Sequence, residues 1–419
     1  MDWNDTPEQS TFRAKVQRFF QEKLPQRYKE RHSSAEIGTM VATDSATIQY
    51  TGRDWNHDRR STDPEVRKAA DQWAKALAAE GYVAASWSKE LGGAGFTTLE
   101  TFIFNEEREA AGAPRVGGTG AMFLGSVLMV HGRPDQQARY MPAIARGEID
   151  WCQGYSEPGA GSDLASLQLR AVKDGDDYVL NGQKLWGNPQ NSEGMYCLVR
   201  TDPEAPKHKG ISFLMIEDLT TEGLAMRGIP NLAGDMPGNG ETFFSNVRVP
   251  RANLIGPENQ GWYVAMTLMD FDRASLSNTL EDRRVMNELI EHATTDEKPK
   301  SRLGEIATVR ADVADRMTEI EVGRNLSLRL ASMQSAGLIP NYEASMGKMY
   351  STELRQRAAR TGTRVFGLYG GLWPGDPRAP VGGEFTSNYC RTVGYTIYGG
   401  SSEIQRNVIA SRGLGLPRG

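Results

Sequence analysis

Apolar residues recur at helical spacing through the first third of the chain. Alanine-rich stretches such as residues 66–77 contain good helix formers and few β-branched runs. After Trp262 the same period returns and persists, with breaks near Pro299 and Pro340. This pattern predicts helices at both ends of the protein.

A different pattern occupies the middle of the chain. Short apolar runs at 178–180, 195–199 and 211–216 are bounded by turn residues, as strands are. The Asn-Gly pair at 181–182, directly after the first run, predicts a hairpin turn. The sequence therefore predicts a mainly α protein with a central β domain.

These changes of pattern predict three domains. We expect an N-terminal helical domain over 1–150, a central β domain over 151–261 and a C-terminal helical bundle over 262–419. Residues from about 32 to 63 are polar and rich in Ser and Thr, which predicts a long loop insertion. Such a loop either covers an active-site entrance or a subunit contact, or is a plain surface loop.

Composition narrows the class of protein. The formal net charge of -5 argues against a nucleic-acid groove or a basic membrane-binding face. The chain has no 18-residue apolar run and a polar N-terminus, so we expect a cytoplasmic protein without a membrane span. The three cysteines are too scattered for a disulfide framework, and the five histidines lack the spacing of metal ligands.

Two glycine-rich stretches carry the candidate chemistry. Residues 155–163, Tyr-Ser-Glu-Pro-Gly-Ala-Gly-Ser-Asp, combine small residues with the hydroxyls of Ser156 and Ser162. Their backbone N–H groups could approach a polar, partly anionic cofactor closely. Taken alone, the same residues also suit a tight turn before a strand.

The second stretch, residues 398–406, reads Tyr-Gly-Gly-Ser-Ser-Glu-Ile-Gln-Arg and leads into a helix-like segment over 403–410. A helix N-terminus behind small hydroxyl residues is a place where anions bind. We therefore expect the two stretches to meet around one ligand.

Both stretches resemble the two signatures of the acyl-CoA dehydrogenases, flavoproteins that oxidise the Cα–Cβ bond of an acyl-CoA thioester. Further segments fall in family order, so that the resemblance covers nearly the whole chain. They are Trp-Ser-Lys-Glu-Leu-Gly-Gly at 87–93, Asn-Glu-Glu at 105–107, Asn-Gly-Gln-Lys-Leu-Trp at 181–186 and Phe-Ser-Asn-Val-Arg-Val-Pro at 244–250.

The resemblance implies an architecture and a set of partners. It implies an N-terminal helical domain, a small β-barrel-like domain and a C-terminal four-helix bundle. It also implies bound FAD, an acyl-CoA substrate and an electron-transfer flavoprotein as electron acceptor. The expected assembly is a homodimer or tetramer, or else a heterotetramer.

The chain departs from the family at the catalytic base. Most members carry a glutamate directly after the tyrosine of the C-terminal signature, but here that position is Gly399. A minority carry the glutamate on the first helix of the C-terminal domain, immediately before an arginine. Asp272 takes that place here, before Arg273, and is the expected base. The resemblance also implies that Asp270, Arg273, Tyr398 and Gly399 contact the substrate.

The residues around Asp272 support this assignment. A stripe at helical spacing is apolar except at the aspartate, and a carboxylate on a buried stripe has a raised pKa that suits a base. The members of this stripe are Gly261, Ala265, Leu268, Asp272, Leu276 and Thr279. Two alternatives are that Asp272 pairs with a cation from another segment, or that it is merely solvated. Asp270 and Arg273 could likewise form an ordinary surface pair.

For FAD, the resemblance implies contacts from both signatures and from the segment between them. Trp186 is expected beside the flavin ring, although it could equally be a core aromatic. Asn188 stands where a hydroxyl residue usually faces the flavin N5 edge. The expected cofactor contacts are Tyr155, Ser156, Gly161, Ser162, Trp186, Asn188, Ser401 and Glu403.

The resemblance also implies contacts with the FAD of a neighbouring subunit. Arg364 stands where a glutamine commonly makes this contact, and Gly367 keeps the glycine-rich turn that follows. The usual Arg-Lys-Thr-Phe-Gly segment is replaced by Glu-Lys-Pro-Lys-Ser-Arg-Leu-Gly at 297–304. Such variants are familiar among members that assemble as hetero-oligomers.

Three functions are consistent with these departures. The first is an acyl-CoA dehydrogenase that uses Asp272 on a branched, cyclic or steroid-side-chain acyl group, because aspartate is shorter than glutamate and Gly399 leaves space. The second is a flavoenzyme of the same fold with different chemistry, such as desulfination or oxygenation. The third is a non-catalytic subunit that completes the FAD site of a partner.

Overall fold

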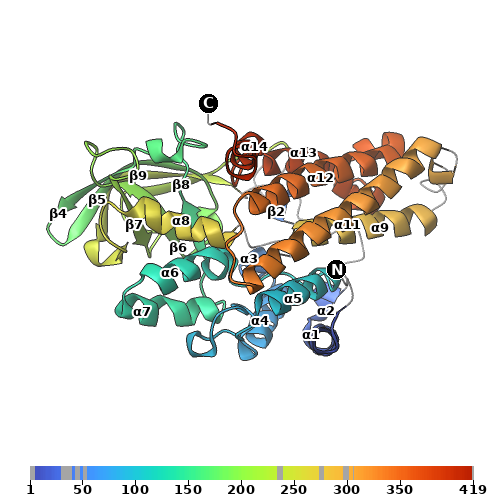
Figure 1. Ribbon diagram of the computed structural model, residues 1–419, viewed down its shortest axis with the longest axis horizontal. Coiled ribbons are helices and arrows are strands. Elements are labelled where there is room, and N and C mark those ends of the chain that lie inside the picture. The colour runs from blue at the N-terminus through green and yellow to red at the C-terminus, as the bar shows by residue number, and fades with distance from the viewer. Residues whose placement is uncertain are drawn as a thin grey trace.

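The computed structural model describes residues 5–29, 40–42, 48–50, 54–233, 239–272, 278–295, 302–304 and 306–417; for 40–42, 48–50, 269–272 and 278 it describes the backbone only. Along the chain, helices precede and follow a sheet domain, which lies at one end of the molecule beside the helical regions; this confirms the predicted fold class (Figure 1). No helix within the described ranges has the length and apolar character needed to cross a bilayer.

The N-terminal region is helical. Its helices are α1 (Pro7–Lys23), α2 (Gln26–Lys29), α3 (Trp55–Asp58), α4 (Pro64–Ala79), α5 (Thr98–Ala110), α6 (Gly125–His131) and α7 (Pro134–Ala145), with short turns η1 (Lys89–Leu91) and η2 (Gly120–Leu124). The helix predicted over 66–77 is confirmed as α4. Trp73 on α4 is fully buried, and its indole N–H donates to the Pro114 carbonyl at 2.9 Å.

The polar segment near 32–63 contains some regular structure. Strands β1 (Met40–Ala42) and β2 (Ile48–Tyr50) pair antiparallel, and α3 follows. Asp54 caps α3 by accepting the N–H groups of Asn56 and His57. Trp55, 2% exposed, joins the core of the N-terminal helices and anchors this end of the segment.

The central domain is an eight-stranded sheet with the order β10-β7-β6-β4-β5-β9-β8, and β3 also pairs with β6. The strands are β3 (Trp151–Gly154), β4 (Arg170–Asp174), β5 (Asp177–Gly187), β6 (Gly194–Arg200), β7 (Ile211–Ile216), β8 (Leu224–Gly228), β9 (Gly240–Pro250) and β10 (Leu254–Ile255), with turns η3 (Leu164–Ser166), η4 (Pro189–Asn191) and η5 (Arg251–Asn253). Every residue of β6 and β7 is buried, which explains their continuous apolar runs.

The hairpin predicted at Asn181-Gly182 is wrong. β5 runs straight through this pair, and the turn to β4 lies between Asp174 and Asp177. The register with β9 instead shifts after Leu180, leaving Asn246 as an extra residue with φ 55°. The Asn181 side chain accepts the Asn246 N–H at 2.9 Å, so the pair stabilises a bulge rather than a turn.

The C-terminal region is again helical. Its elements are α8 (Gly261–Asp272), α9 (Asn278–Thr295), α11 (Ala307–Ser335), α12 (Tyr342–Phe366), α13 (Glu384–Tyr395) and α14 (Ser402–Val408), with η6 (Gly367–Gly371), η7 (Pro380–Gly383) and η8 (Ile409–Gly413). α8 packs on β7 and α6, whereas α9, α11, α12 and α13 form a bundle (Figure 1). The break predicted near Pro340 separates α11 from α12; the one near Pro299 lies outside the described residues.

Candidate active site

The first signature stretch forms a tight turn at the end of β3. Glu157 and Ala160 exchange two backbone hydrogen bonds of 3.0 Å each. Gly161 and Ser162 follow on the surface, and a Cβ at Gly159 or Gly161 would have no heavy atom within 4 Å. The turn that the residues alone suggested is therefore present, and it leaves open space beside its glycines.

This turn lies against the C-terminal half of β5. The Leu185 N–H donates to the Ser156 carbonyl at 2.9 Å. A Cβ at Gly187 would stand 2.9 Å from the Gln153 carbonyl oxygen, so only glycine allows the two segments to approach this closely. The structure thus brings Tyr155 and Ser156 together with Trp186.

A buried ion pair holds the turn in place. Lys184 and Glu157 are 2% and 8% exposed, and the ammonium donates to the Tyr155 carbonyl at 2.9 Å and to Glu157 Oε1 at 2.8 Å. The Glu157 carboxylate also accepts the backbone N–H groups of Gln168 and Leu169. Burial lowers the pKa of Lys184, and the charge of Glu157 opposes this shift.

Trp186 is 57% exposed, which excludes its alternative as a core aromatic. Its φ of 70° is unusual for a residue with a side chain, and such strain persists only where the surroundings impose it. Two residues on, the Asn188 Oδ1 accepts a hydrogen bond from the Asn191 side chain at 3.2 Å. An exposed indole with a strained backbone therefore follows Leu185, which is bonded to Ser156, and precedes Asn188 by two residues.

The second signature stretch is held by the helical bundle. Ser401 caps α14 by accepting the Ile404 N–H at 3.3 Å, which confirms the expected helix start. Lys348 on α12 donates to the carbonyls of Tyr395 and Gly400 at 3.0 and 2.7 Å. The two signatures thus rest on different domains, and their meeting around one ligand stays a prediction.

The space around Gly399 is open. Its φ is 64°, and a Cβ there would meet only Lys348 Cε, at 3.9 Å. Tyr398 is 61% exposed. Glu403 lies on the surface, where a backbone hydrogen bond and the Ser401 hydroxyl lower its pKa.

The stripe on α8 is buried as far as the structure describes it. Gly261 is buried, and Ala265 and Leu268 are 0% and 2% exposed. Asp270 and Asp272 belong to α8, but their side chains, like Arg273 and Leu276, lie outside the described part of the chain. The role of Asp272 stays a prediction.

The residues expected near a neighbouring subunit lie together at the end of α12. Arg364 forms an ion pair with Asp312 of α11, and its side chain is 49% exposed. The Arg302 guanidinium lies directly against Gly367, whose φ is 58°. Arg302 belongs to the segment that replaces the usual Arg-Lys-Thr-Phe-Gly run. This residue of the replaced segment therefore lies beside the glycine-rich turn.

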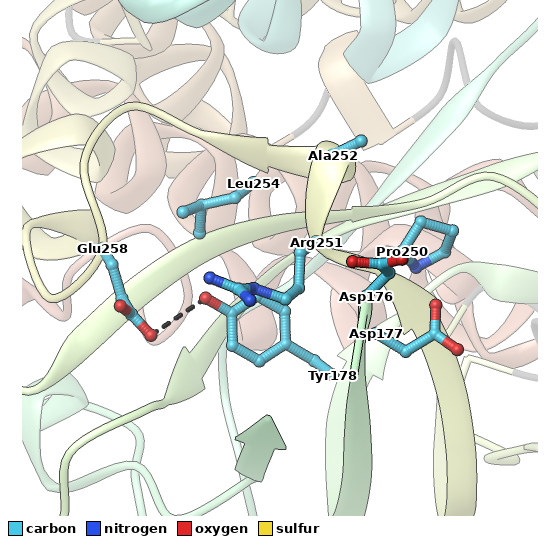
Figure 2. A pocket seen from close by; sticks show the side chains of 8 residues that line it. All are labelled: Asp176, Asp177, Tyr178, Pro250, Arg251, Ala252, Leu254 and Glu258. Atoms are coloured by element: carbon cyan, nitrogen blue, oxygen red, sulfur yellow. Dashed lines mark hydrogen bonds between the residues drawn. The ribbon is translucent and has the colours of Figure 1, made fainter. Parts of the chain in front are cut away.

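A surface cavity of about 590 Å³ lies at the other end of β5 (Figure 2). There the Tyr178 hydroxyl donates to Glu258 at 2.9 Å, and burial together with this carboxylate raises the pKa of Tyr178 to about 12. The lining residues are Asp176, Asp177, Tyr178, Pro250, Arg251, Ala252, Leu254 and Glu258. None of the predicted site residues lines this cavity.

Reasoning from the sequence missed the residues that hold the site. Glu157 and Lys184 lie inside the segments at 155–163 and 181–186, and their opposite charges were a usable signal of an ion pair. Lys348 and Asn191 gave no such signal, because their partners are distant in sequence or are backbone carbonyls.

Models of three acyl-CoA dehydrogenase domains match the chain: the N-terminal domain at residues 48–148, the middle domain at 152–247 and the C-terminal domain at 259–414. The chain belongs to the acyl-CoA dehydrogenase family. It is therefore an oxidoreductase of this family, as the resemblance implied.

Individual acyl-CoA dehydrogenases match over most of their length. Acyl-CoA dehydrogenase FadE26 of Mycobacterium tuberculosis is 36% identical over 348 residues, 81% of this chain and 86% of that protein. A structure described as the Tcur3481-Tcur3483 steroid ACAD matches with a TM-score of 0.83 and 29% identity, covering 100% of both chains. The ChsE4-ChsE5 complex from Mycobacterium tuberculosis matches with a TM-score of 0.79 and 31% identity, also covering 100% of both chains.

The family generally uses FAD, and the residues present fit this group. Open glycines at 159 and 161 expose backbone donors, Ser156 and Ser162 add hydroxyls, and Trp186 presents an exposed ring. A flavin needs both kinds of contact, since its ring is planar and aromatic while its diphosphate is anionic.

Proposed function

We propose that the protein binds FAD and oxidises the Cα–Cβ bond of an acyl-CoA. The observation that carries this proposal is the position of Trp186, exposed at φ 70° and joined through Leu185 to the signature turn at Ser156. Bound FAD would supply the hydride acceptor. Trp186 and Asn188 would face the flavin ring. The remaining contacts from the central sheet domain would come from Tyr155, Ser156, Gly161 and Ser162.

The bundle would supply the remaining contacts. Ser401 and Glu403 would lie near the diphosphate and adenosine end of FAD. Arg364 and Gly367 would face the FAD of a neighbouring subunit.

Asp272 would remove the α-proton. Asp272 is the last residue of α8, and the residues of the same stripe one and two turns earlier, Leu268 and Ala265, are buried. A carboxylate next to such a surface is poorly solvated, which raises its basicity. Asp270 and Arg273 would contact the thioester end of the substrate.

The acyl group would be branched, cyclic or a steroid side chain. Gly399 replaces the glutamate of most members, and a Cβ added at its backbone would meet only Lys348. Tyr398 would line the same space. The match to a structure described as a steroid acyl-CoA dehydrogenase supports a bulky substrate.

An anaerobic titration tests the proposal. Purified protein is mixed with straight-chain, branched, cyclic and steroid-side-chain acyl-CoAs, and the oxidised-flavin absorbance is followed, because the cofactor itself reports the reaction. We expect a bulky class of acyl-CoA to bleach the flavin of the wild-type protein. In the Asp272→Asn variant, the FAD content should be normal but no acyl-CoA should bleach the flavin. A yellow protein that none of these acyl-CoAs reduces would contradict the proposed reaction and favour different flavin chemistry.

A second candidate is a subunit that works only within a heteromer. Two matching structures are two-protein assemblies by their descriptions, and the segment at 297–304 departs from the family. Purified alone, such a subunit would lack FAD and gain it on mixing with a partner subunit. An FAD-loaded homodimer or homotetramer that is reduced by acyl-CoA would exclude this candidate. In either case an electron-transfer flavoprotein is the proposed electron acceptor.

A further inference from the structure

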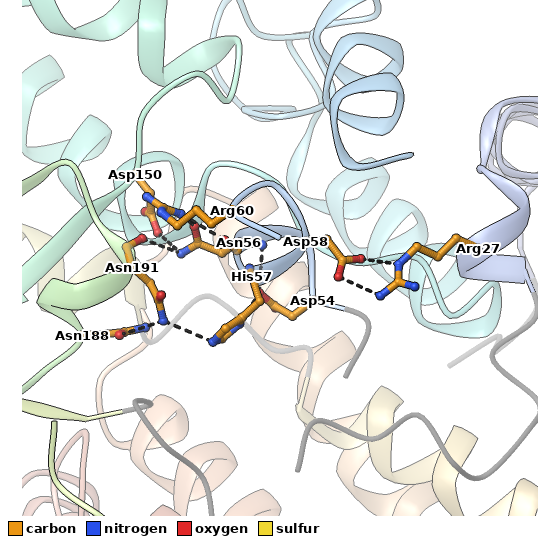
Figure 3. Close-up of polar contacts among 9 residues, drawn as sticks. All are labelled: Arg27, Asp54, Asn56, His57, Asp58, Arg60, Asp150, Asn188 and Asn191. Carbon is orange, nitrogen blue, oxygen red and sulfur yellow. Dashed lines mark hydrogen bonds and ion pairs between the residues drawn. The ribbon is translucent and has the colours of Figure 1, made fainter. Parts of the chain in front are cut away.

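The N-terminal segment docks onto the loop that carries Asn188. Asn56 of α3 donates through its side chain to Asp150 Oδ2 at 2.7 Å and to the Asn191 carbonyl at 3.0 Å. Arg60 contacts the Asn56 side chain (Figure 3). It also forms an ion pair with Glu193. A segment far from the signatures in sequence therefore lies beside the proposed flavin contacts.

This docking places His57 at the end of a chain of hydrogen bonds. The Asn191 Nδ2 lies 3.2 Å from His57 Nε2 and 3.2 Å from Asn188 Oδ1 (Figure 3). On the other side of the imidazole, His57 Nδ1 lies 3.3 Å from Asp54 Oδ1. Asn191 is 7% exposed, so water competes poorly for its amide.

The direction of each hydrogen bond follows from the chemistry of the groups. An amide nitrogen only donates, so His57 Nε2 must accept, and the ring proton must be on Nδ1, which faces the Asp54 carboxylate. The second Asn191 proton goes to Asn188 Oδ1. Because a side-chain amide is planar, with its oxygen and nitrogen about 120° apart, engaging the oxygen also fixes the direction of the Asn188 Nδ2.

We propose that His57 is a positioning residue that, through Asn191, fixes Asn188 with its N–H donor directed at the flavin edge. The inference rests on the proposed function, because it takes Asn188 as a flavin contact. A donor held in a fixed direction suits a ring nitrogen that accepts a hydrogen bond. Because the amide is already ordered in the folded protein, binding of FAD would cost no further side-chain entropy there. A freely rotating amide would present its oxygen part of the time.

The test compares His57→Phe, which removes the acceptor, with His57→Gln, whose side-chain oxygen can accept from Asn191. We expect His57→Phe to shift the flavin absorption band and reduction potential and to slow flavin reduction by about tenfold, the effect of one hydrogen bond. FAD content should stay unchanged, and His57→Gln should restore most of the rate. His208→Phe is the matched control, since His208 is exposed and packs edge-to-face against Trp262, away from this chain of contacts.

A third variant reverses the polarity. Asn191→Asp places a carboxylate, which only accepts, against Asn188, so the Asn188 amide should turn and direct its oxygen outward. We expect this variant to slow flavin reduction at least as much as His57→Phe. If both variants leave spectrum, potential and rate at the wild-type values, the inference is overturned while the proposed function stands.

A readout without substrate separates the two proposals. In protein labelled with ¹⁵N-histidine, the His57 signal, assigned by its loss in His57→Gln, should show a protonated Nδ1 and an unprotonated Nε2. This result would support the hydrogen-bond chain even if no acyl-CoA reduced the flavin. A proton on Nε2 would overturn it even in a fully active enzyme.

Discussion

The two signature stretches are each tied down by a lysine, but in different surroundings. On the sheet side, Lys184 is 2% exposed and its charge is neutralised by Glu157, which also accepts two backbone N–H groups. On the bundle side, Lys348 is half-buried and donates to the two carbonyls of Tyr395 and Gly400. The sheet side is therefore rigidly preformed, whereas the bundle side is an open glycine loop.

This difference suits a division of labour. A cofactor that stays bound profits from a preorganised turn whose polar groups are satisfied internally. The proposed acyl pocket needs room, and no neighbouring heavy atom comes closer than 3.9 Å to the ideal Cβ of Gly399. We expect changes on the sheet side to affect folding and FAD, and changes around Gly399 to affect substrate choice more than FAD content, although Ser401 and Glu403 of the same stretch are proposed FAD contacts.

The largest effect is expected from Lys184→Met. Removing the ammonium leaves the Glu157 carboxylate buried without its partner, which costs about 3–5 kcal/mol of unfolding free energy. Urea denaturation measures the loss, and FAD content should fall with it. The double variant Lys184→Met/Glu157→Gln should be more stable than Lys184→Met alone; equal stability would show that the ion pair does not couple the two residues.

The second effect depends on pH and concerns the bundle. Asp282 on α9 is 6% exposed, and this burial raises its pKa to about 7. The positive charge of Arg355 opposes the shift, and the negative charge of Glu281 adds to it. Since the folded state holds this proton more tightly than the unfolded chain, the contribution of Asp282 to stability falls as pH rises from about 4 to about 7.

Urea midpoints at pH 5 and pH 8 measure this slope. Asp282→Asn cannot ionise, so its stability should change less between the two pH values than that of the wild type. An identical change in both proteins would assign the slope to other groups.

Lys348→Met should have a smaller effect on stability. The ammonium is only half-buried and binds carbonyls rather than a buried carboxylate, so we expect a loss of about 1–2 kcal/mol. The acyl-CoA dissociation constant should rise by a larger factor than FAD content falls, because the loop at Gly400 loses its tether. A loss of FAD with unchanged acyl-CoA affinity would contradict the division between the two sides.

The smallest expected effects distinguish the cost of a strained backbone conformation from the cost of filling space with a Cβ. Gly399→Ala places a Cβ in open space but at φ 64°, so we expect a cost of about 1 kcal/mol from the backbone alone. Gly159→Ala, on the sheet side, has equally open space without a positive φ and should be nearly neutral. Thermal unfolding compares the pair; equal costs would show that the conformation of Gly399 is not what demands glycine.

Periodicity alone predicted the order of helical, sheet and helical regions, because long amphipathic and apolar runs report local burial. The turn signal of the Asn181-Gly182 pair was wrong, because the pairing of β5 with β9 absorbed these residues into a bulge. Periodicity also read the segment before Asp63 as a loop, although α3 lies within it, because four residues show no period. Local sequence cannot report the partner strand that decides such cases.

The sequence by itself determined the family, through signatures whose glycines and hydroxyls act locally, and it singled out Asp272 and Gly399 as departures. Only the tertiary structure decided that Trp186 is exposed, that Lys184 and Lys348 hold the two loops, and that His57 reaches Asn191. His57 and Asn191 are 134 residues apart. Hydrogen bonds between distant segments depend on how the domains pack, and packing leaves no periodic trace in either segment.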